Sequence, residues 1–247
     1  MNKRLFLILI GLILSVMTFT MCKSQSVSVP STPEEALAEL IAGNERYVNE
    51  KSIHPHGNLD RVKETAPHQA PFAAVVGCSD SRVPVELLFD QGIGDIFVIR
   101  TAGNNVNSEM VMGSVDYAIE HLGVKLLLVL GHGSCGGVTG AISEGEEEHG
   151  NIGHLLGTIR NDVSDYVGKI ECLDSAIHHH TQVQVERIAY PHVAEKIAKG
   201  DLLVKKAYYD VNTGKVTYCN IICAFASAEA IWHYTLTPPP ANILIIR

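Results

Sequence analysis

Short apolar runs alternate along most of the chain with longer segments in which apolar residues recur every three or four positions. The short runs have the length and β-branched content of strands, and the longer segments have the period of amphipathic helices. Strands are predicted at 72–76, 95–100, 125–130, 202–210 and 215–222. Because helical segments separate most of them, we expect an α/β fold. Its mostly parallel sheet, flanked by helices, should have about four parallel strands and an antiparallel edge strand.

An N-terminal helical arm is predicted ahead of the first strand. Thr32 and Glu35 have capping-box spacing, and Pro33 fits the first helical position, so the helix should begin there. A connection with three prolines, 51–71, separates this arm from the sheet. Further helices are predicted at 107–122 and within 151–200.

The first 22 residues resemble an export signal. Lys3 and Arg4 precede an uncharged, mostly apolar stretch, 5–20. This stretch is shorter than the roughly 20 apolar residues of a membrane span, which favours a signal peptide. Cys22 follows directly, where a lipoprotein signal carries its lipid, so both a Sec-type signal and lipidation stay open. Either predicts export to the periplasm or cell envelope, and lipidation would attach the protein to a membrane.

The remaining chain divides by composition into three parts. A polar linker, 23–31, leads to the folded domain, 32–222, which an apolar extension of unknown role, 223–247, follows. The 247 residues carry a formal net charge of −8, so no nucleic-acid partner is expected.

Reactive side chains follow two of the predicted strands. Cys78, Asp80 and Arg82 come at alternate positions after the first, and His132 and Cys135 follow the strand at 125–130. Open α/β sheets place their sites at the carboxyl ends of parallel strands, so the two cysteines and the histidine can converge. Two thiolates and an imidazole suit zinc, and three protein ligands leave the fourth position to water.

Other interpretations stay open for single residues. A cysteine after a strand is commonly a buried small hydrophobic residue, and Asp80 could cap the next helix with Arg82 as a surface charge. Gly103 could let the backbone approach a small substrate, or could form a simple tight turn. The run His178–His180 is expected on an exposed helix surface.

Taken together, these motifs resemble the β-class carbonic anhydrases. The resemblance is carried by Cys78-Ser79-Asp80-Ser81-Arg82 and Gly131-His132-x-x-Cys135-Gly136, and by the segments 89–95, 100–104, 114–118, 120–124 and 207–216. It covers about residues 33 to 220. It implies a zinc lyase that hydrates CO₂ reversibly to bicarbonate and a proton, with one Zn²⁺ per subunit. It also implies a homodimer or tetramer in which the N-terminal helix packs on a partner subunit.

The charges of such a site suggest the roles of Asp80 and Arg82. Zinc with two thiolates is formally neutral, so its pull on water is weaker than in a three-histidine site, and hydration should rise through mildly alkaline pH. Asp80 would orient the zinc-bound hydroxide that attacks CO₂, and Arg82 would hold Asp80 by a bidentate pair. In related enzymes the aspartate can instead occupy the fourth zinc position, and both arrangements stay open.

Two rival functions share these residues. The same scaffold could hydrolyse CS₂ or COS, or the chain could be a non-catalytic zinc or redox protein in which Cys78 and Cys135 form a disulfide. The Asp80–Arg82 pair weighs against the second rival, because a structural site does not need it.

Overall fold

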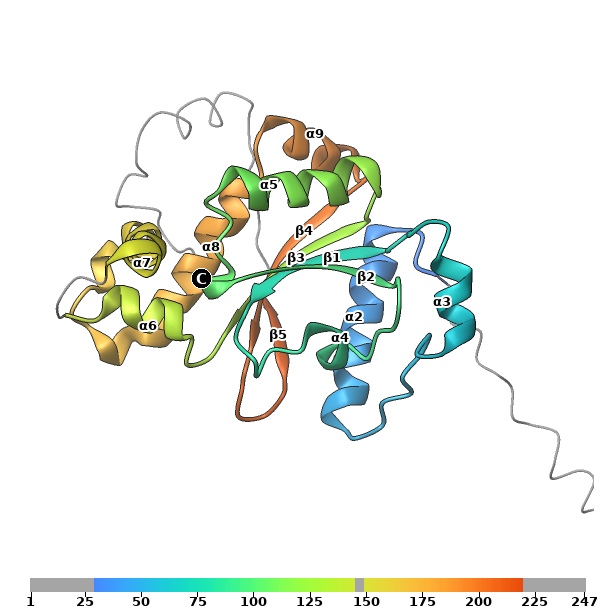
Figure 1. Ribbon diagram of the computed structural model, residues 1–247, viewed down its shortest axis with the longest axis horizontal. Helices are drawn as coiled ribbons and strands as arrows, with labels where there is room; N and C mark the ends of the chain where they lie inside the picture. The colour runs from blue at the N-terminus through green and yellow to red at the C-terminus, as the bar shows by residue number, and fades with distance from the viewer. Residues whose placement is uncertain (1–28, 145–148, 220–247) are drawn as a thin grey trace, which may run out of the picture.

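The computed structural model describes residues 29–144 and 149–219, and its strands form one sheet in the order β2-β1-β3-β4-β5 (Figure 1). The strands are β1 (Ala73–Cys78), β2 (Ile96–Thr101), β3 (Leu126–His132), β4 (Leu203–Tyr209) and β5 (Val216–Cys219). β1 to β4 are parallel, and β5 runs antiparallel to β4 at one edge. This confirms the predicted mostly parallel sheet with its antiparallel edge strand.

Helices connect the strands and flank the sheet (Figure 1). They are α2 (Pro33–Val48), α3 (Leu59–Thr65), α4 (Val85–Leu88), α5 (Glu109–Asp116), α6 (Gly136–Ile142), α7 (Gly150–Asp162), α8 (Leu173–Ile188) and α9 (Pro191–Lys199). Short turns are η1 (Ala102–Asn104), the π turn η2 (Tyr117–His121), η3 (Ser164–Tyr166) and η4 (Ile170–Cys172). The helix predicted at 107–122 is α5 continued by η2, and the helical region 151–200 divides into α7, α8 and α9.

Both faces of the central strands are buried. Successive residues of β1 point to opposite faces, so Ala73 and Val75 pack with α2 and α4, whereas Ala74 and Val76 pack with α5, α8 and α9. Every residue of β1 and β3 is buried. Continuous apolar sequences are what parallel strands covered on both faces require, which explains why these two runs lack alternation.

The strands β1 and β3 extend further than their apolar runs. β1 was predicted to end at residue 76, but Gly77 pairs with Arg100 and Cys78 with Thr101, so the ladder to β2 continues through Cys78. β3 similarly continues to His132 along its ladder with β4. Cys78 and His132 are therefore the terminal residues of adjacent parallel strands.

The N-terminal helix α2 begins with the predicted capping box and packs on the core of its own chain. Leu40 is buried there, and Gly43 approaches the Phe89 carbonyl so closely that a Cβ would lie 1.8 Å from its oxygen. The Asn44 side chain bonds to backbone groups of Leu88, Gly214 and Val216. The packing of this helix on a partner subunit, which the family resemblance implied, stays a prediction.

Several sequence predictions concern residues outside the described ranges. They are the signal segment with Cys22, the linker up to residue 28, and the extension 223–247. Within the described ranges, no helix has both the length and the apolarity that crossing a membrane demands.

Candidate metal centre

Three predicted ligands meet at the carboxyl end of the sheet. Cys78 ends β1, His132 ends β3, and Cys135 occupies the N-cap position of α6. One ligand atom from each lies within 4.8 Å of the others, and all three residues are buried. The neighbouring positions of β1 and β3 in the sheet produce this convergence, as the sequence predicted.

The His132 ring is prepared to bind a metal. Its Nδ1 lies 2.9 Å from the carbonyl oxygen of Gly133, so Nδ1–H donates there and the free lone pair belongs to Nε2. Nε2 is buried and has no hydrogen-bond partner in the described part of the chain. An unpartnered buried nitrogen with its tautomer fixed by the other ring nitrogen is the arrangement of a zinc-binding histidine.

The two thiols share a hydrogen bond. This bond is the main cause that lowers the pKa of Cys78, although burial opposes it, and it raises the pKa of Cys135. Backbone N–H groups of Gly103 and Asp80 also donate to Cys78 Sγ, at 3.2 and 3.4 Å. Both cysteines are free. A thiolate, a second thiol and a free imidazole nitrogen fit the donor set that zinc prefers.

Asp80 and Arg82 form a bidentate pair beside these ligands. Arg82 Nε donates to Oδ1 at 2.9 Å and Nη2 donates to Oδ2 at 2.7 Å. These hydrogen bonds hold the pKa of Asp80 well below its usual range, although burial opposes them. Of the two arrangements left open above, the structure has the one in which Arg82 binds the Asp80 carboxylate. Asp80 does not cap α4, because that helix begins after Pro84 and has no side-chain cap.

Arg100 is a positioning residue that the sequence analysis missed. Its Nε donates to the carbonyl oxygen of Cys78 at 3.0 Å, and its Nη2 donates to that of Asp80 at 2.7 Å. Arg100 therefore fixes the backbone between the two site residues. The available signal was a charged residue at the end of the apolar run 96–99, in the strand predicted at 95–100.

Gly103 contacts the centre through its backbone. It has φ of 69°, and a Cβ on it would lie 2.8 Å from Ile159 Cδ1, so both conformation and space favour glycine. Its N–H donates to Cys78, and its carbonyl oxygen accepts from His180 Nε2 at 2.8 Å. Both polar groups are engaged within the protein, so contact with substrate stays a prediction.

The histidine run lies only partly on an exposed surface: His179 is exposed as predicted, His178 is partly buried, and His180 faces the core. His180 is completely buried because α8 packs beside β3 and α6, and His178 stacks on Tyr208 with ring centroids 4.5 Å apart. The helical period turns one member of the run toward the core. Sequence alone did not show which face of α8 is covered.

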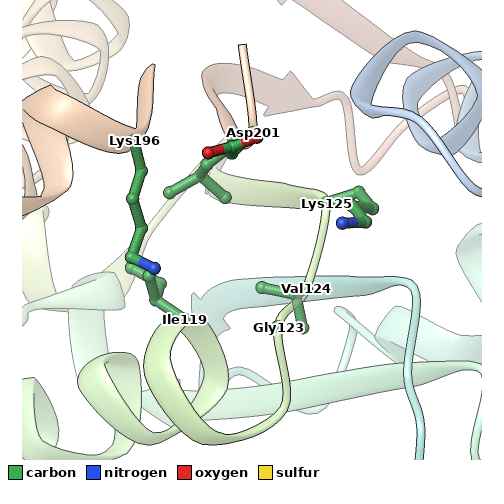
Figure 2. Close-up of a pocket in the computed structure, with 7 residues that line it drawn as sticks. Ile119, Gly123, Val124, Lys125, Lys196 and Asp201 are labelled. Carbon is green, nitrogen blue, oxygen red and sulfur yellow. The ribbon is translucent and has the colours of Figure 1, made fainter. Parts of the chain in front are cut away.

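None of the predicted ligands lines the cavity of about 220 Å³, whose lining residues Figure 2 shows. Lys125 and Leu202, which immediately precede β3 and β4, line it together with Lys196 and Asp201. It is therefore at the amino ends of the strands, opposite the cysteines and His132, and it takes no part in their chemistry.

Sequence comparisons agree with this geometry. The profile of a protein family described as "Carbonic anhydrase" matches residues 73–216. "Carbonic anhydrase 2" of Mycobacterium tuberculosis is 35% identical over 195 residues, which are 76% of this chain and 93% of that protein. The carbonic anhydrase of Mycolicibacterium smegmatis is 43% identical over 129 residues, covering 51% of this chain and 62% of that protein.

Solved structures resemble the fold as well. A Coccomyxa β-carbonic anhydrase in complex with acetazolamide superposes with a TM-score of 0.59 at 26% identity, over 74% of this chain and 85% of that one. One of two tetrameric β-carbonic anhydrases from Sordaria macrospora superposes with a TM-score of 0.57 at 25% identity, over 74% of this chain and 96% of that one.

Proposed function

Because this chain belongs to the carbonic anhydrase family, we propose that it hydrates CO₂ reversibly to bicarbonate and a proton, using one zinc ion per subunit. Cys78, His132 and Cys135 would hold the ion. The observation that carries the proposal is the convergence of their three ligand atoms within 4.8 Å, with His132 Nε2 unpartnered in the described chain and the Asp80–Arg82 pair alongside.

Bound zinc would act as a Lewis acid that lowers the pKa of water, less strongly with two thiolate ligands than with three imidazoles, so hydration is expected to rise through mildly alkaline pH. Asp80 would orient the attacking water. Its Oδ1 accepts two hydrogen bonds, from the backbone N–H and Nε of Arg82, whereas Oδ2 accepts one from Nη2. A carboxylate oxygen has two lone pairs, so Oδ2 retains one that can accept a hydrogen bond from the attacking water.

Zinc retention in two ligand variants tests the assignment. Cys78→Ser and His132→Ala should lose zinc and CO₂ hydration together, because removing a ligand opens the site. Cys172→Ser is the matched control, since Cys172 is a free, partly exposed cysteine outside the cluster. Full zinc content in both ligand variants would contradict the proposed centre.

Turnover of each gas separates the rival functions. Purified protein that hydrolyses CS₂ or COS but does not hydrate CO₂ would reassign the substrate on the same scaffold. A non-catalytic zinc or redox protein would turn over none of them. The free thiols of Cys78 and Cys135 argue against the disulfide form of that second rival, and the Asp80–Arg82 pair argues against a purely structural zinc site.

We also propose a homo-oligomer, since the Sordaria structures similar to this fold are described as tetrameric. Light scattering of the purified protein should give the mass of a dimer or tetramer. A monomer at micromolar concentration would overturn this part of the proposal.

Export to the periplasm or cell envelope remains a proposal that rests on the basic, then apolar, start of the sequence. The exported protein would be released by signal cleavage or attached to the membrane through Cys22. Cell fractionation tests this, and a soluble cytoplasmic product that retains residues 1–20 would contradict it.

A further inference from the structure

A completely buried histidine lies behind the candidate metal centre, and the proposed reaction does not use it. Both ring nitrogens of His180 have hydrogen-bond partners: Nε2 is 2.8 Å from the Gly103 carbonyl oxygen, and Nδ1 is 3.0 Å from Asp162 Oδ2 and 3.2 Å from Gln184 Nε2. The side chains of His180 and Asp162 are 0% and 2% exposed. A buried imidazole held at both nitrogens has a fixed position and orientation.

Asp162 is itself held from a second direction. Arg187 donates to both carboxylate oxygens, at 2.6 and 2.5 Å, and Gln184 Nε2 donates to Oδ2 at 2.8 Å. Burial alone would raise the pKa of Asp162, but the hydrogen bonds and charges of His180 and Arg187 outweigh it and lower the pKa to about 2. The carboxylate is therefore an anion whose geometry α7 and α8 jointly determine.

This network reaches the metal centre through one residue. The carbonyl of Gly103 accepts from His180, and the N–H of the same residue donates to Cys78 Sγ at 3.2 Å. Gly103 lies in the short turn η1 with a left-handed backbone, where Cys78 and His180 hold it from opposite sides. Without the His180 bond, the position of the N–H that faces the thiolate would depend on the turn alone.

We propose that His180 is a positioning residue for the metal centre, which fixes η1 so that the Gly103 N–H stays on the Cys78 thiolate. Asp162 and Arg187 hold His180 in the orientation that this requires. The inference rests on the proposed function, because it concerns the thiolate of the same zinc site. Groups outside the ligand shell that orient ligands in this way affect both metal affinity and the electron density on the ligand.

Two amide substitutions distinguish the hydrogen bond made by Nε2 from the one made by Nδ1. In His180→Gln the side-chain N–H₂ can take the place of Nε2 and still donate to Gly103. In His180→Asn the shorter amide reaches the position of Nδ1, near Asp162, and leaves the Gly103 carbonyl without its donor. Both variants are neutral amides at one buried position, so a general loss of stability should affect them alike.

Cobalt(II) is the probe, because its thiolate charge-transfer absorption reports the electron density on the cysteine sulfurs. In His180→Asn this band should move to lower energy, since a thiolate that loses an N–H donor holds its electrons less tightly. Chelator competition should also show zinc bound about 10-fold more weakly. In His180→Gln both quantities should be close to those of the original protein. Ile188→Ala is the control. Ile188 is buried on the same helix but packs with Ala74 and Val76 on one face of the sheet, so this variant should lower stability without moving the band.

The outcomes separate this inference from the proposed function. If the unaltered protein binds neither cobalt nor zinc, the proposed zinc site itself is wrong. If the unaltered protein binds cobalt but the band of His180→Asn does not move, or moves equally in His180→Gln, His180 serves only folding and the inference is overturned. Should His180→Asn fail to fold, a band of His180→Gln that differs from that of the unaltered protein overturns it as well.

Discussion

Two aspartate–arginine pairs near the metal centre have the same bidentate chemistry and differ in how deeply the carboxylate is buried. Asp80 and Arg82 are two residues apart in one turn, with side chains 17% and 51% exposed. Asp162 and Arg187 are 25 residues apart on different helices, with side chains 2% and 31% exposed. The first pair keeps a carboxylate lone pair free at the edge of the site, whereas the second surrounds its carboxylate with donors. The first arrangement suits contact with substrate, and the second suits holding other groups in place.

The different surroundings imply different energetic roles. An ion pair between exposed side chains stabilises a fold by only about 0–1 kcal/mol, because water screens it and ordering the side chains costs entropy. Removing one partner of a buried pair costs about 3–5 kcal/mol, because a charge is left buried and uncompensated. Mutations should therefore separate the pairs, with activity depending on the first and stability on the second.

The largest effect is expected from Asp80→Asn. The amide keeps the shape of the side chain but loses the charge that orients water, so CO₂ hydration should fall about 10²- to 10⁴-fold. Zinc content and the free energy of unfolding should stay the same. Stopped-flow hydration measured beside zinc quantification tests this, with Asp60→Asn as the control for an exposed, ion-paired carboxylate. A rate near that of the unaltered protein would show that the pair is only structural.

Asp162→Asn should lower stability rather than activity. The neutral amide leaves Arg187 and His180 without their shared anion. Because Arg187 is 31% exposed, the loss should be smaller than for a fully buried pair, and the lowered pKa of Asp162 implies a fall in the free energy of unfolding of about 2–3 kcal/mol. Arg82→Ala should change it by less than about 1 kcal/mol. Urea unfolding of both variants measures the difference. Equal losses of stability would remove the distinction between the two pairs.

Lowering the pH should reveal how much Asp162 contributes to the stability of the unaltered protein. The folded pKa of Asp162 is about 2, below the value near 3.9 of an unfolded aspartate. A group with a depressed folded pKa contributes stability that is present above the unfolded pKa and is lost as pH falls through the folded one. Asp162 should therefore contribute on the order of 2–3 kcal/mol above pH 4, which disappears between about pH 4 and pH 2.

Urea unfolding across this pH range, in the original protein and in Asp162→Asn, isolates the contribution, since all other groups are common to both. The curve of the variant should be shallower between pH 4 and pH 2. Parallel curves would show that Asp162 does not titrate as the buried pair requires.

The two regions also differ in how far the sequence could predict them. The ligands and the Asp80–Arg82 pair follow the apolar runs that mark their strands, so local pattern and the position of sites at the carboxyl ends of parallel strands were enough to predict that they meet. His180 lies 77 residues from Gly103, and its burial depends on how α8 packs on β3 and α6. A run of three histidines has no periodicity that distinguishes its buried member. Arg100 was missed for a related reason, because its partners are backbone carbonyls, one at the end of β1 and one in the turn that follows.

The smallest effect should come from Arg82→Lys, which keeps the charge and removes the planar fork. Arg82 Nε and Nη2 bind separate oxygens of Asp80, and Nη2 also donates to the Ser134 carbonyl at 3.1 Å. One ammonium group cannot reproduce this geometry, so Asp80 should lose orientation but keep its charge. We expect CO₂ hydration to fall about 10-fold, equivalent to about 1.4 kcal/mol, with the melting temperature unchanged.

Arg187→Lys is the matched substitution at the buried pair. It should lower the melting temperature and leave hydration much closer to that of the original protein. If Arg82→Lys retains full activity, charge alone suffices at the open pair. The bidentate hold on Asp80 would then have no catalytic role. A loss as large as that of Asp80→Asn would instead show that the orientation of Asp80 matters as much as its charge.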